Sequence, residues 1–484
     1  MEISNLSYRR RILILCICCI SILMVSLDST IINVALPSLQ HDLHTHISGT
    51  QWTIDAYTLV LASLLLLSGS TADRIGRKRV FKTGLIIFSL GSLLCSIAPD
   101  IGWLIFFRML QAVGGSMLNP VALSIINNTF ADTKERARAI GVWGGVVGIS
   151  LAAGPVVGGT LVSTIGWRSI FWINIPIGII ALLLTTLFIP ESKVEKHRRP
   201  DMIGQLLVIG FLASLIYGII EAPQRGWRTP LIIGCFAMSL IFFIALFKYE
   251  HRRVEPLIEM RFFRSAPFTG ATIIAICAFV GLGGFLFLNT MYLQDVRLYS
   301  AIRAGLFLLP MAGAMLIAGP VSGYIVSRRG PRMPLIVGGI AVSLAATLFA
   351  ISARKIADSE LFTGYVLIGL GLGLLNAAIT NTALSGMPRS EAGVAAATTS
   401  TSRQVGQSLG VAIIGSVLAI NAANVTAGPV FTHDSRICWW ILSGAGLAVL
   451  ATAIITTGRW ATETAEENQE MIEAADHQMA ITQA

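Results

Sequence analysis

The chain has 484 residues, of which 54% are hydrophobic and only 13% are charged. Soluble globular proteins carry about 25% charged residues, so this composition excludes that class. The net charge of +9 would suit a nucleic-acid binder, but basic loops between membrane spans account for it better, and we expect no nucleic acid as a partner. The seven cysteines all lie in or beside apolar runs and indicate neither a disulfide framework nor a metal site.

Apolar runs of about 20 residues recur along the chain and predict transmembrane helices. The first run is too long for the core of a signal peptide, so we interpret it as a retained span. We predict fourteen spans, at residues 12–36, 50–71, 80–98, 101–126, 138–164, 169–189, 203–221, 230–247, 267–292, 304–327, 333–353, 361–385, 394–420 and 437–457. With the amino terminus inside, most Lys and Arg residues lie in cytoplasmic loops, as the positive-inside rule requires. The even number of spans places both termini in the cytoplasm.

An internal repeat relates the two ends of the chain. The loop sequence of residues 69–78 recurs in residues 323–332, at an offset of 254, with serine in place of the acid. The Met-Leu-Asn sequence at 117–119 matches Leu-Leu-Asn at 374–376, at an offset of 257. Two repeated halves around a central pathway are typical of transporters.

We therefore predict an all-α polytopic membrane protein, with two six-helix halves and two extra helices inserted between them. The predicted regions are a cytoplasmic amino terminus (1–11), a first bundle (12–189), a linker with two extra helices (190–266), a second bundle (267–457) and an acidic cytoplasmic tail (458–484).

Six short sequences lie in order at matching spans. They are LDSTIINVALP (27–37), GSTADRIGRK (69–78), RMLQAVGG (108–115), GPVVGG (154–159), WRSIFWINIP (167–176) and YLQ (292–294). Together they resemble the fourteen-span drug:proton antiporter branch of the major facilitator superfamily, and the match covers nearly the whole chain. The chain departs from the family pattern at Ala112 and Ser150, where glycine is common. The sequence WTIDAY (52–57) resembles the subgroup that exports bulky cationic antiseptics and dyes.

The resemblance implies a multidrug efflux transporter in the bacterial inner membrane. Such a protein exports lipophilic, mostly cationic compounds in exchange for protons by alternating access. The proton gradient drives it, so no cofactor is expected, and a monomer is expected to be sufficient.

Two acids and an arginine inside apolar spans are candidates for proton and substrate binding. Exchange of a proton for a cation requires a buried carboxylate, because burial disfavours the charged form. Asp28 lies about 24 Å into a core of about 30 Å, and Asp55 lies about 7 Å from the outer end of the next span. Arg108 lies about 10 Å from the outer face and needs a carboxylate partner, which either acid can supply. In the family this arginine is thought to tune the proton carrier; the alternative is a static ion pair.

Two further charged residues complete the candidate site. Arg403 lies within a span and has no acid near it in its own half. It either neutralises a first-half carboxylate across the cavity or binds backbone carbonyls. Glu221 ends the seventh span and is either a solvated cap or an outer contact for cations.

Two motifs are interpreted as parts of the moving machinery. The loop motif is interpreted as a latch of the cytoplasmic gate, and its residues are Gly69, Asp73, Arg74, Gly76, Arg77 and Lys78. The fifth span carries the antiporter-type motif Gly154, Pro155, Gly158 and Gly159, which the resemblance interprets as a seal against proton leak. The proline bends the helix and frees a carbonyl. Upstream glycines within 141–148 recur at helical spacing and predict tight helix contact.

The sequence leaves other functions to consider beside multidrug efflux. An exporter of an anionic or neutral natural product, metabolite or siderophore uses the same fold, with Arg108 and Arg403 facing the ligand. A membrane enzyme is disfavoured because no phosphate-binding loop, nucleophile motif or His-containing acid/base cluster occurs. A channel or passive sensor is disfavoured by the internal repeat.

Overall fold

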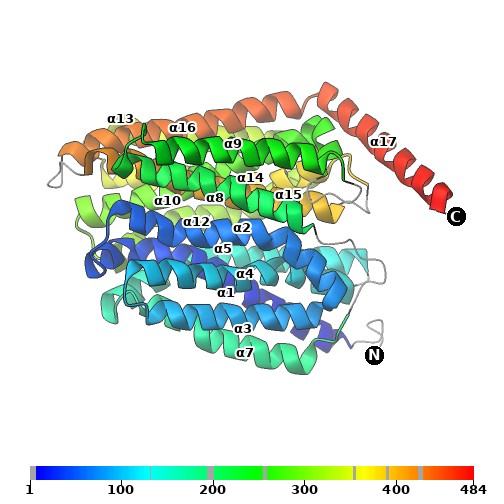
Figure 1. Cartoon of the computed structure of the whole chain (residues 1–484), viewed down its shortest axis with the longest axis horizontal. Helices are drawn as coiled ribbons and strands as arrows, with labels where there is room; N and C mark the ends of the chain where they lie inside the picture. The colour runs from blue at the N-terminus through cyan, green and yellow to red at the C-terminus, as the bar shows by residue number, and fades with distance from the viewer. Residues whose placement is uncertain are drawn as a thin grey trace.

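The computed structural model describes residues 7–130, 132–192, 201–253, 259–352, 356–388, 392–422 and 429–483. Over these residues the chain forms long helices that run side by side, with both ends of the chain at the same end of the molecule (Figure 1). We call this the inner end and the opposite one the outer end. The predicted amino-terminal residues 1–6 and the linker residues 193–200 and 254–258 lie outside the described residues.

The described residues of the first half form helices joined by short turns, as apolar sequences must in a membrane, where each backbone polar group needs a partner within the chain. Its helices are α1 (Tyr8–Asp42), α2 (Ile47–Ile75), α3 (Arg77–Ser96), α4 (Ile101–Thr129), α5 (Thr133–Thr164), α6 (Ser169–Trp172) and α7 (Asn174–Phe188). Helix α4 begins where Asp100 accepts a hydrogen bond from the amide of Trp103. Helix α1 packs against α4, α5 and α7, and α3 packs against α4 and α7.

The second half repeats this arrangement. Its elements are η2 (Met260–Arg264), α10 (Ala266–Met291), η3 (Tyr292–Val296), α11 (Ala301–Phe307), α12 (Leu309–Arg329), α13 (Arg332–Ser352), α14 (Asp358–Leu384), α15 (Ala392–Ala422) and α16 (Pro429–Thr456). Helix α10 packs against α14, α15 and α16, and α14 also packs against α12 and α13.

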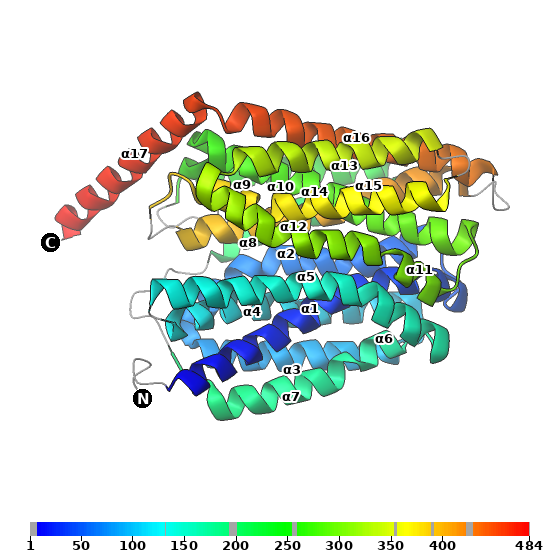
Figure 2. The ribbon, with the colours of Figure 1, turned by 180° about the vertical axis from the view of Figure 1, so that it is seen from behind.

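Two boundaries join the halves. Helix α2 meets α15 on one face, and α5 meets α11 and α12 on the opposite face (Figure 2). Helices α8 (Met202–Arg225) and α9 (Pro230–Glu250) form a pair in which α8 contacts both α2 and α15. The pair therefore covers one of the two boundaries.

Close glycine contacts repeat in the two halves at the offsets seen in the sequence. A Cβ on Gly84 would lie 3.1 Å from the carbonyl oxygen of Gly114, where α3 crosses α4. A Cβ on Gly338 would lie 3.0 Å from the carbonyl oxygen of Gly371, where α13 crosses α14. Glycine permits such close helix contact, so the sequence repeat reflects repeated packing.

Among the described residues, fewer helices than the fourteen predicted spans meet the criteria of length and hydropathy for a membrane span. Among the described residues, twelve helices are long and apolar enough to cross a membrane, or thirteen if the bent pair Ile47–Leu65 and Leu67–Ile75 counts as one span. The remaining predicted span, 394–420, is helical as part of α15, but its first half is rich in Ser, Thr and Gln and holds Arg403. The fourteenth crossing and the insertion of α8 and α9 stay predictions.

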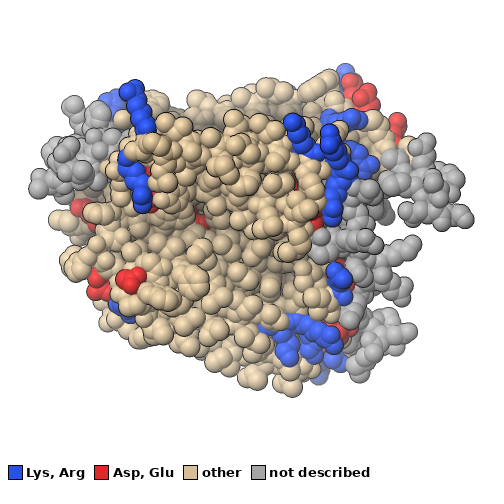
Figure 3. Space-filling view, viewed as in Figure 1, with Lys and Arg blue, Asp and Glu red and all other residues tan. Residues whose placement is uncertain are grey.

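Charged side chains gather toward the two ends of the molecule, with a largely uncharged belt between them (Figure 3). The acidic tail forms a further helix, α17 (Arg459–Gln483), at the inner end. Ala461, Ala465 and Ile472 of α17 are buried, and the amide of Ala266 donates to Thr464 Oγ1 at 3.1 Å. The tail is therefore docked on the second half.

Candidate functional site

Asp28 and Arg108 form a buried ion pair in the first half. Arg108 Nη1 lies 2.6 Å from Asp28 Oδ2, and each side chain is 1% exposed. The packing of α1 against α4 brings the two residues together. The sequence left open which acid Arg108 meets, and its partner is Asp28.

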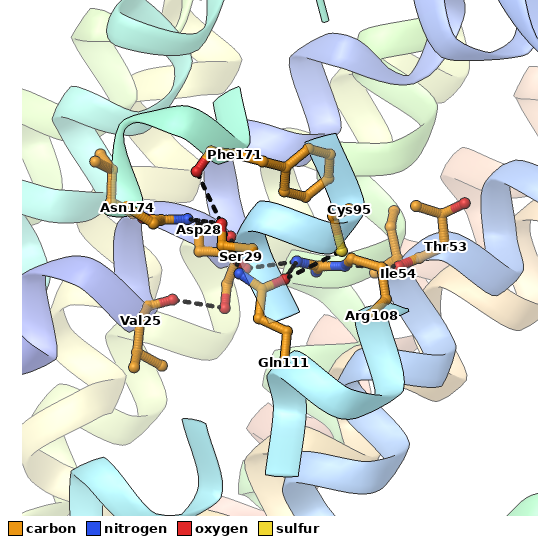
Figure 4. A network of polar contacts seen from close by, with 12 residues as sticks. Val25, Asp28, Ser29, Thr53, Ile54, Cys95, Arg108, Gln111, Phe171 and Asn174 are labelled. Atoms are coloured by element: carbon orange, nitrogen blue, oxygen red, sulfur yellow. Dashed lines mark hydrogen bonds and ion pairs between the residues drawn. The ribbon is translucent and has the colours of Figure 1, made fainter. Parts of the chain in front are cut away.

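Two amide side chains complete the bonds to Asp28 (Figure 4). Asp28 Oδ1 accepts from Gln111 Nε2 at 2.8 Å and from Asn174 Nδ2 at 2.9 Å. Gln111 Oε1 in turn accepts from Arg108 Nη1 at 2.8 Å. The Asp28 carboxylate thus has a cation and two amide donors, which together compensate its buried charge.

Arg108 also connects this network to α2. Its Nε donates to the carbonyl oxygen of Thr53 at 3.2 Å. Its guanidinium lies 4.1 Å from the centre of the Tyr57 ring, a cation–π contact. A change in the ion pair therefore reaches the backbone of the helix that carries Asp55.

Asp55 points away from the ion pair, toward the other half of the molecule. Its side chain is fully buried, and Asp55 Oδ1 accepts from Ser408 Oγ of α15 at 2.7 Å. Asp55 Oδ2 has no hydrogen-bond partner among the described residues, and none of the described ion pairs includes this carboxylate. The two acids on which the prediction focused therefore do not meet, and only one of them has a cation.

The contact between α2 and α15 that encloses Asp55 is tight. We call it the α2–α15 seam. Gln51 Nε2 donates to the carbonyl oxygens of Val411 (3.3 Å) and Ala412 (3.0 Å). A Cβ on Gly415 would overlap the Gln51 side chain, so any larger residue here would displace that side chain.

Arg403 binds within its own half. Its Nη2 donates to the carbonyl oxygen of Asn376 at 3.1 Å and to Thr380 Oγ1 at 2.6 Å, both on α14. Among the described residues, no carboxylate forms an ion pair with Arg403, and its Nε has no hydrogen-bond partner. Of the two predicted arrangements, the structure has the one with a backbone carbonyl.

Glu221 is bonded on both oxygens and is half-buried. Its Oε1 accepts from Trp52 Nε1 at 3.1 Å, and its Oε2 pairs with Arg225 Nε at 2.8 Å. Gln224 Nε2 adds a bond to Ser48 Oγ at 2.9 Å. These contacts attach α8 to the outer part of α2.

The predicted gate motif forms a compact turn between α2 and α3. Asp73 Oδ1 accepts from Arg77 Nε at 3.1 Å and from Arg77 Nη2 at 3.0 Å. Gly76 has a φ of +124°, a backbone conformation that favours glycine. Gly69 lies near Pro120 of α4, and Arg74 is exposed and forms none of the described ion pairs.

An acid that the motif does not contain holds this turn in place. Glu191 Oε1, just after α7, accepts from the backbone amide of Lys78 at 3.1 Å, and Glu191 Oε2 lies 3.7 Å from Arg79 Nε. Lys78 Nζ donates to the carbonyl oxygen of Thr186 at 2.9 Å. These contacts of the turn stay within the first half.

The antiporter-type motif lies where α5 meets α1 and α11. A Cβ on Gly158 would lie 2.6 Å from Ile31 Cγ1, and one on Gly154 would overlap Thr30. A Cβ on Gly159 would overlap the carbonyl oxygen of Ala301 in the second half. The Pro155 carbonyl oxygen likewise faces Gly305 of α11. The motif therefore packs against both halves.

The prediction of tight contact at the upstream glycines is wrong for most of them. A Cβ on Gly141, Gly144 or Gly145 would meet nothing within 4 Å, and one on Gly148 would meet only Leu316, at 3.7 Å. Three glycines of α12, at 313, 319 and 323, are equally free of neighbours. Figure 2 shows α5 and α12 farther apart toward the inner end, where these glycines of α5 have no helix against them.

At the outer end, by contrast, the halves are bonded to each other. Gln294 Nε2 donates to the carbonyl oxygen of Val34 at 2.8 Å, and the amide of Ile302 donates to Ser163 Oγ at 3.2 Å. A hollow of about 670 Å³ between these outer ends is lined by both halves. The structure is therefore closed at the outer end, and α5 and α12 are separated toward the inner end.

The sequence as a whole matches one family model. The model described as Major Facilitator Superfamily matches residues 18–411. The chain belongs to the major facilitator superfamily. It is thus a transporter of a family of multi-span membrane proteins, rather than an enzyme.

Bacterial members of the superfamily with related sequences carry names of resistance and export. The chain is 36% identical over 411 residues to the tetracenomycin C resistance and export protein of Streptomyces glaucescens, covering 84% of this chain and 76% of that one. It is 35% identical over 403 residues to the multidrug resistance protein Stp of Mycobacterium tuberculosis, covering 83% and 74%. The puromycin resistance protein pur8 of Streptomyces alboniger is 35% identical over 426 residues, covering 86% and 84%.

Solved structures of the superfamily fold are similar at low sequence identity. A peptide transporter POT in complex with sulfate has a TM-score of 0.66 at 14% identity, covering 93% of this chain and 95% of that one. A bacterial homologue of the human lysosomal transporter Spinster has a TM-score of 0.66 at 16% identity, covering 96% and 99%. These likenesses support the fold.

Sequence reasoning missed several bonded residues. Gln111 and Asn174 were within the quoted motifs but were not singled out, although each is a polar residue in an apolar span. In the second half, Tyr365 Oη donates to Asn289 Oδ1 at 2.6 Å, and both side chains are buried. Tyr365 follows Arg108 at the repeat offset of 257, so the repeat pointed to Tyr365; the same offset from Asp28 leads to Phe285, so it did not point to Asn289.

Proposed function

We propose that this superfamily member is a multidrug efflux transporter that exports lipophilic, cationic compounds in exchange for protons by alternating access. The observation that carries the proposal is Asp55, a buried carboxylate between the halves with no cation bonded to it among the described residues. Such a carboxylate is unfavourable as an uncompensated charge, and either a proton or a cation relieves this. The names of the related resistance proteins support export as the direction.

The proposal includes the arrangement in the cell. A monomer lies in the bacterial inner membrane with both termini in the cytoplasm. Residues 12–189 and 267–457 form the two bundles that rock against each other, and residues 190–266 hold the inserted pair. The proton gradient supplies the energy without a cofactor.

Each part of the site has a role in this proposal. The described state, closed at the outer end, takes up a compound from the inner side. Asp28 and Arg108 hold α1 and α4 in register and transmit changes to α2 through Thr53. The turn with Asp73 and Arg77 closes the inner end later in the cycle, and the motif at Gly154–Gly159 seals the boundary with α11.

The test is efflux of ethidium from energised cells and uptake into inverted vesicles, with and without an uncoupler. We expect Asp55→Asn and Asp28→Asn each to reduce proton-driven transport at least about tenfold. Glu466→Gln, on the exposed face of α17, is the matched control and should transport normally. Unimpaired proton-driven transport by both site variants would overturn the proposal.

One observation favours a second candidate, the export of an anionic or neutral natural product. Arg403 is half-buried, has no described carboxylate and keeps its Nε free of a partner among the described residues. An anionic ligand would satisfy it. Transport of such a compound that survives both acid substitutions but is lost in Arg403→Ala would select this candidate.

A further inference from the structure

We propose that Asp55, and not Asp28, takes up and releases the proton, and that its ionisation separates α2 from α15. The inference rests on the proposed antiporter function and deepens it. It names the proton site and links that site to the conformational change.

The two acids differ in what compensates their charge. Asp28 has the Arg108 guanidinium at 2.6 Å and amide donors from Gln111 and Asn174. A proton added to this carboxylate would displace a donor and leave Arg108 buried without its counter-charge, which is strongly unfavourable. Asp28 is therefore suited to stay ionised through the cycle.

Asp55 has the opposite surroundings. It receives one hydroxyl hydrogen bond, from Ser408, and its second oxygen is bare among the described residues. A neutral carboxylic acid fits this site, because its bare oxygen carries the proton and its other oxygen accepts from Ser408. An ionised carboxylate there would be a buried charge with one neutral donor, which favours any rearrangement that admits water.

The charged and titratable groups around Asp55 are engaged elsewhere. On α4, Arg108 is paired with Asp28 of α1; on α15, Arg403 points to α14; on α8, Glu221 is paired with Arg225. Cys95 of α3 contacts Gln111, and Tyr57 of α2 lies over Arg108. None of these described groups forms an ion pair with Asp55.

The seam is also closed from the side by α8. Trp52 bonds to Glu221 of α8 at 3.1 Å, and Ser416 Oγ of α15 donates to the carbonyl oxygen of Ile219 at 2.6 Å. Helix α8 thus bonds to both sides of the seam. Water from the outer side reaches Asp55 when α2 and α15 move apart.

The protonation of Asp55 and the closure of the α2–α15 seam are therefore thermodynamically linked. When the O–H bond of Asp55 breaks in the described, outer-closed state, the proton passes to water on the inner side and the electron pair stays on the carboxylate, which favours an open seam. When Asp55 regains a proton from the outer side, the seam closes around the neutral acid. Proton uptake therefore drives the return to the described, outer-closed state.

The first test uses infrared pH-difference spectra of the purified full-length protein in lipid nanodiscs without drug. We expect a carboxylic-acid carbonyl band that disappears as the pH rises, is present in Asp28→Asn and is absent in Asp55→Asn. Ser408→Ala should keep the band but move it to higher frequency, because the hydrogen bond to Oδ1 is lost. A band that is lost in Asp28→Asn and kept in Asp55→Asn overturns the assignment, as does an unchanged frequency in Ser408→Ala.

The second test measures the seam itself. Gln51→Cys combined with Gly415→Cys places two thiols across it, and mass spectrometry gives the yield of the linked peptides. Ser343→Cys with Ser443→Cys, whose hydroxyls lie 3.2 Å apart within the second half, corrects for thiol chemistry. We expect the corrected yield to fall as the pH rises, and to stay high when Asp55→Asn is added. A corrected yield that does not depend on pH, or that falls equally in Asp55→Asn, overturns the link to the seam.

The outcomes separate this inference from the proposed function. Neither test needs a substrate, so both can succeed even if ethidium efflux proves independent of protons; the proposed function then fails alone. If efflux is proton-driven but the band survives Asp55→Asn, the assignment of the proton site fails alone.

Discussion

At the residue scale, the Asp28–Arg108 pair is held by more than attraction between two charges. Removing two ions from water costs several kcal/mol each, and the pair offsets this only because further donors and acceptors surround it. Gln111, Asn174 and the Thr53 carbonyl supply those bonds. The ion pair and its neighbours therefore act as one unit.

This unit predicts a non-additive mutant cycle. Arg108→Gln leaves the Asp28 carboxylate buried without a cation and should destabilise the protein by about 3–5 kcal/mol. Adding Asp28→Asn removes the stranded charge and should restore a large part of the loss. Thermal unfolding in detergent measures both, with exposed Arg74→Gln as the control. A double variant that is as unstable as the sum of the two single ones would contradict this account.

The sequence located the charged residues of the site but not their partners. A carboxylate deep in an apolar span is visible as an anomaly, which is how Asp28 was found. Whether it meets Arg108 or faces Asp55 depends on how three helices are rotated about their axes, and an apolar sequence with little periodic contrast does not specify this. The sequence did not point to Ser408 either, because serine is common in membrane helices and does not stand out there.

At the element scale, α5 changes its role along its length. Its part toward the outer end packs through Gly154, Gly158 and Gly159, whereas Gly141 and Gly144 have open space around them. The spacing of the glycines is similar in both parts, so the pattern in the sequence predicted tight packing throughout. What distinguishes the parts is that the outer one packs against α1 and α11, whereas no neighbouring helix lies against the other two glycines.

One glycine substitution in each part of α5 tests this difference. Gly159→Val would force the valine side chain into the carbonyl of Ala301, and such overpacking costs about 1–3 kcal/mol. The expected result is a lower stability of the outer-closed state and slower transport. Gly141→Ala adds a methyl group where nothing lies within 4 Å, and should leave transport unchanged and raise stability by up to about 1 kcal/mol, because alanine favours the helix over glycine. Thermal unfolding and the rate of ethidium efflux are the measurements, and equal effects of the two substitutions would refute the difference.

At the scale of the whole molecule, the helical content and the two-part repeat were predictable from the sequence. Long apolar runs permit little besides helices in a membrane, and the repeat offsets of 254 and 257 reappear in the glycine contacts of α3 with α4 and α13 with α14. The number of crossings was less predictable, because α15 mixes polar and apolar residues.

Reporter fusions determine the number of membrane crossings. If α15 crosses the membrane, a fluorescent protein fused after Met387 should be active in the cytoplasm, and alkaline phosphatase fused after Ala422 should be active outside. A fluorescent protein fused to the carboxyl terminus should again be active inside, because fourteen is even. Phosphatase activity at the carboxyl terminus would show an odd number of crossings and refute the predicted orientation.

The hydrogen bond between Tyr365 and Asn289 gives the first-half ion pair a natural comparison. Both pairs join a helix early in one half to the fourth long helix of that half, and both are buried. The second half thus has a polar contact between the corresponding helices without a charged residue in it. A neutral link suffices to hold two such helices together, so architecture alone does not account for the charges on Asp28 and Arg108. The second half thus contains an uncharged counterpart of the ion pair. Exchanging the two pairs between the halves would show whether the charges of Asp28 and Arg108 are needed for transport or only for holding the helices together.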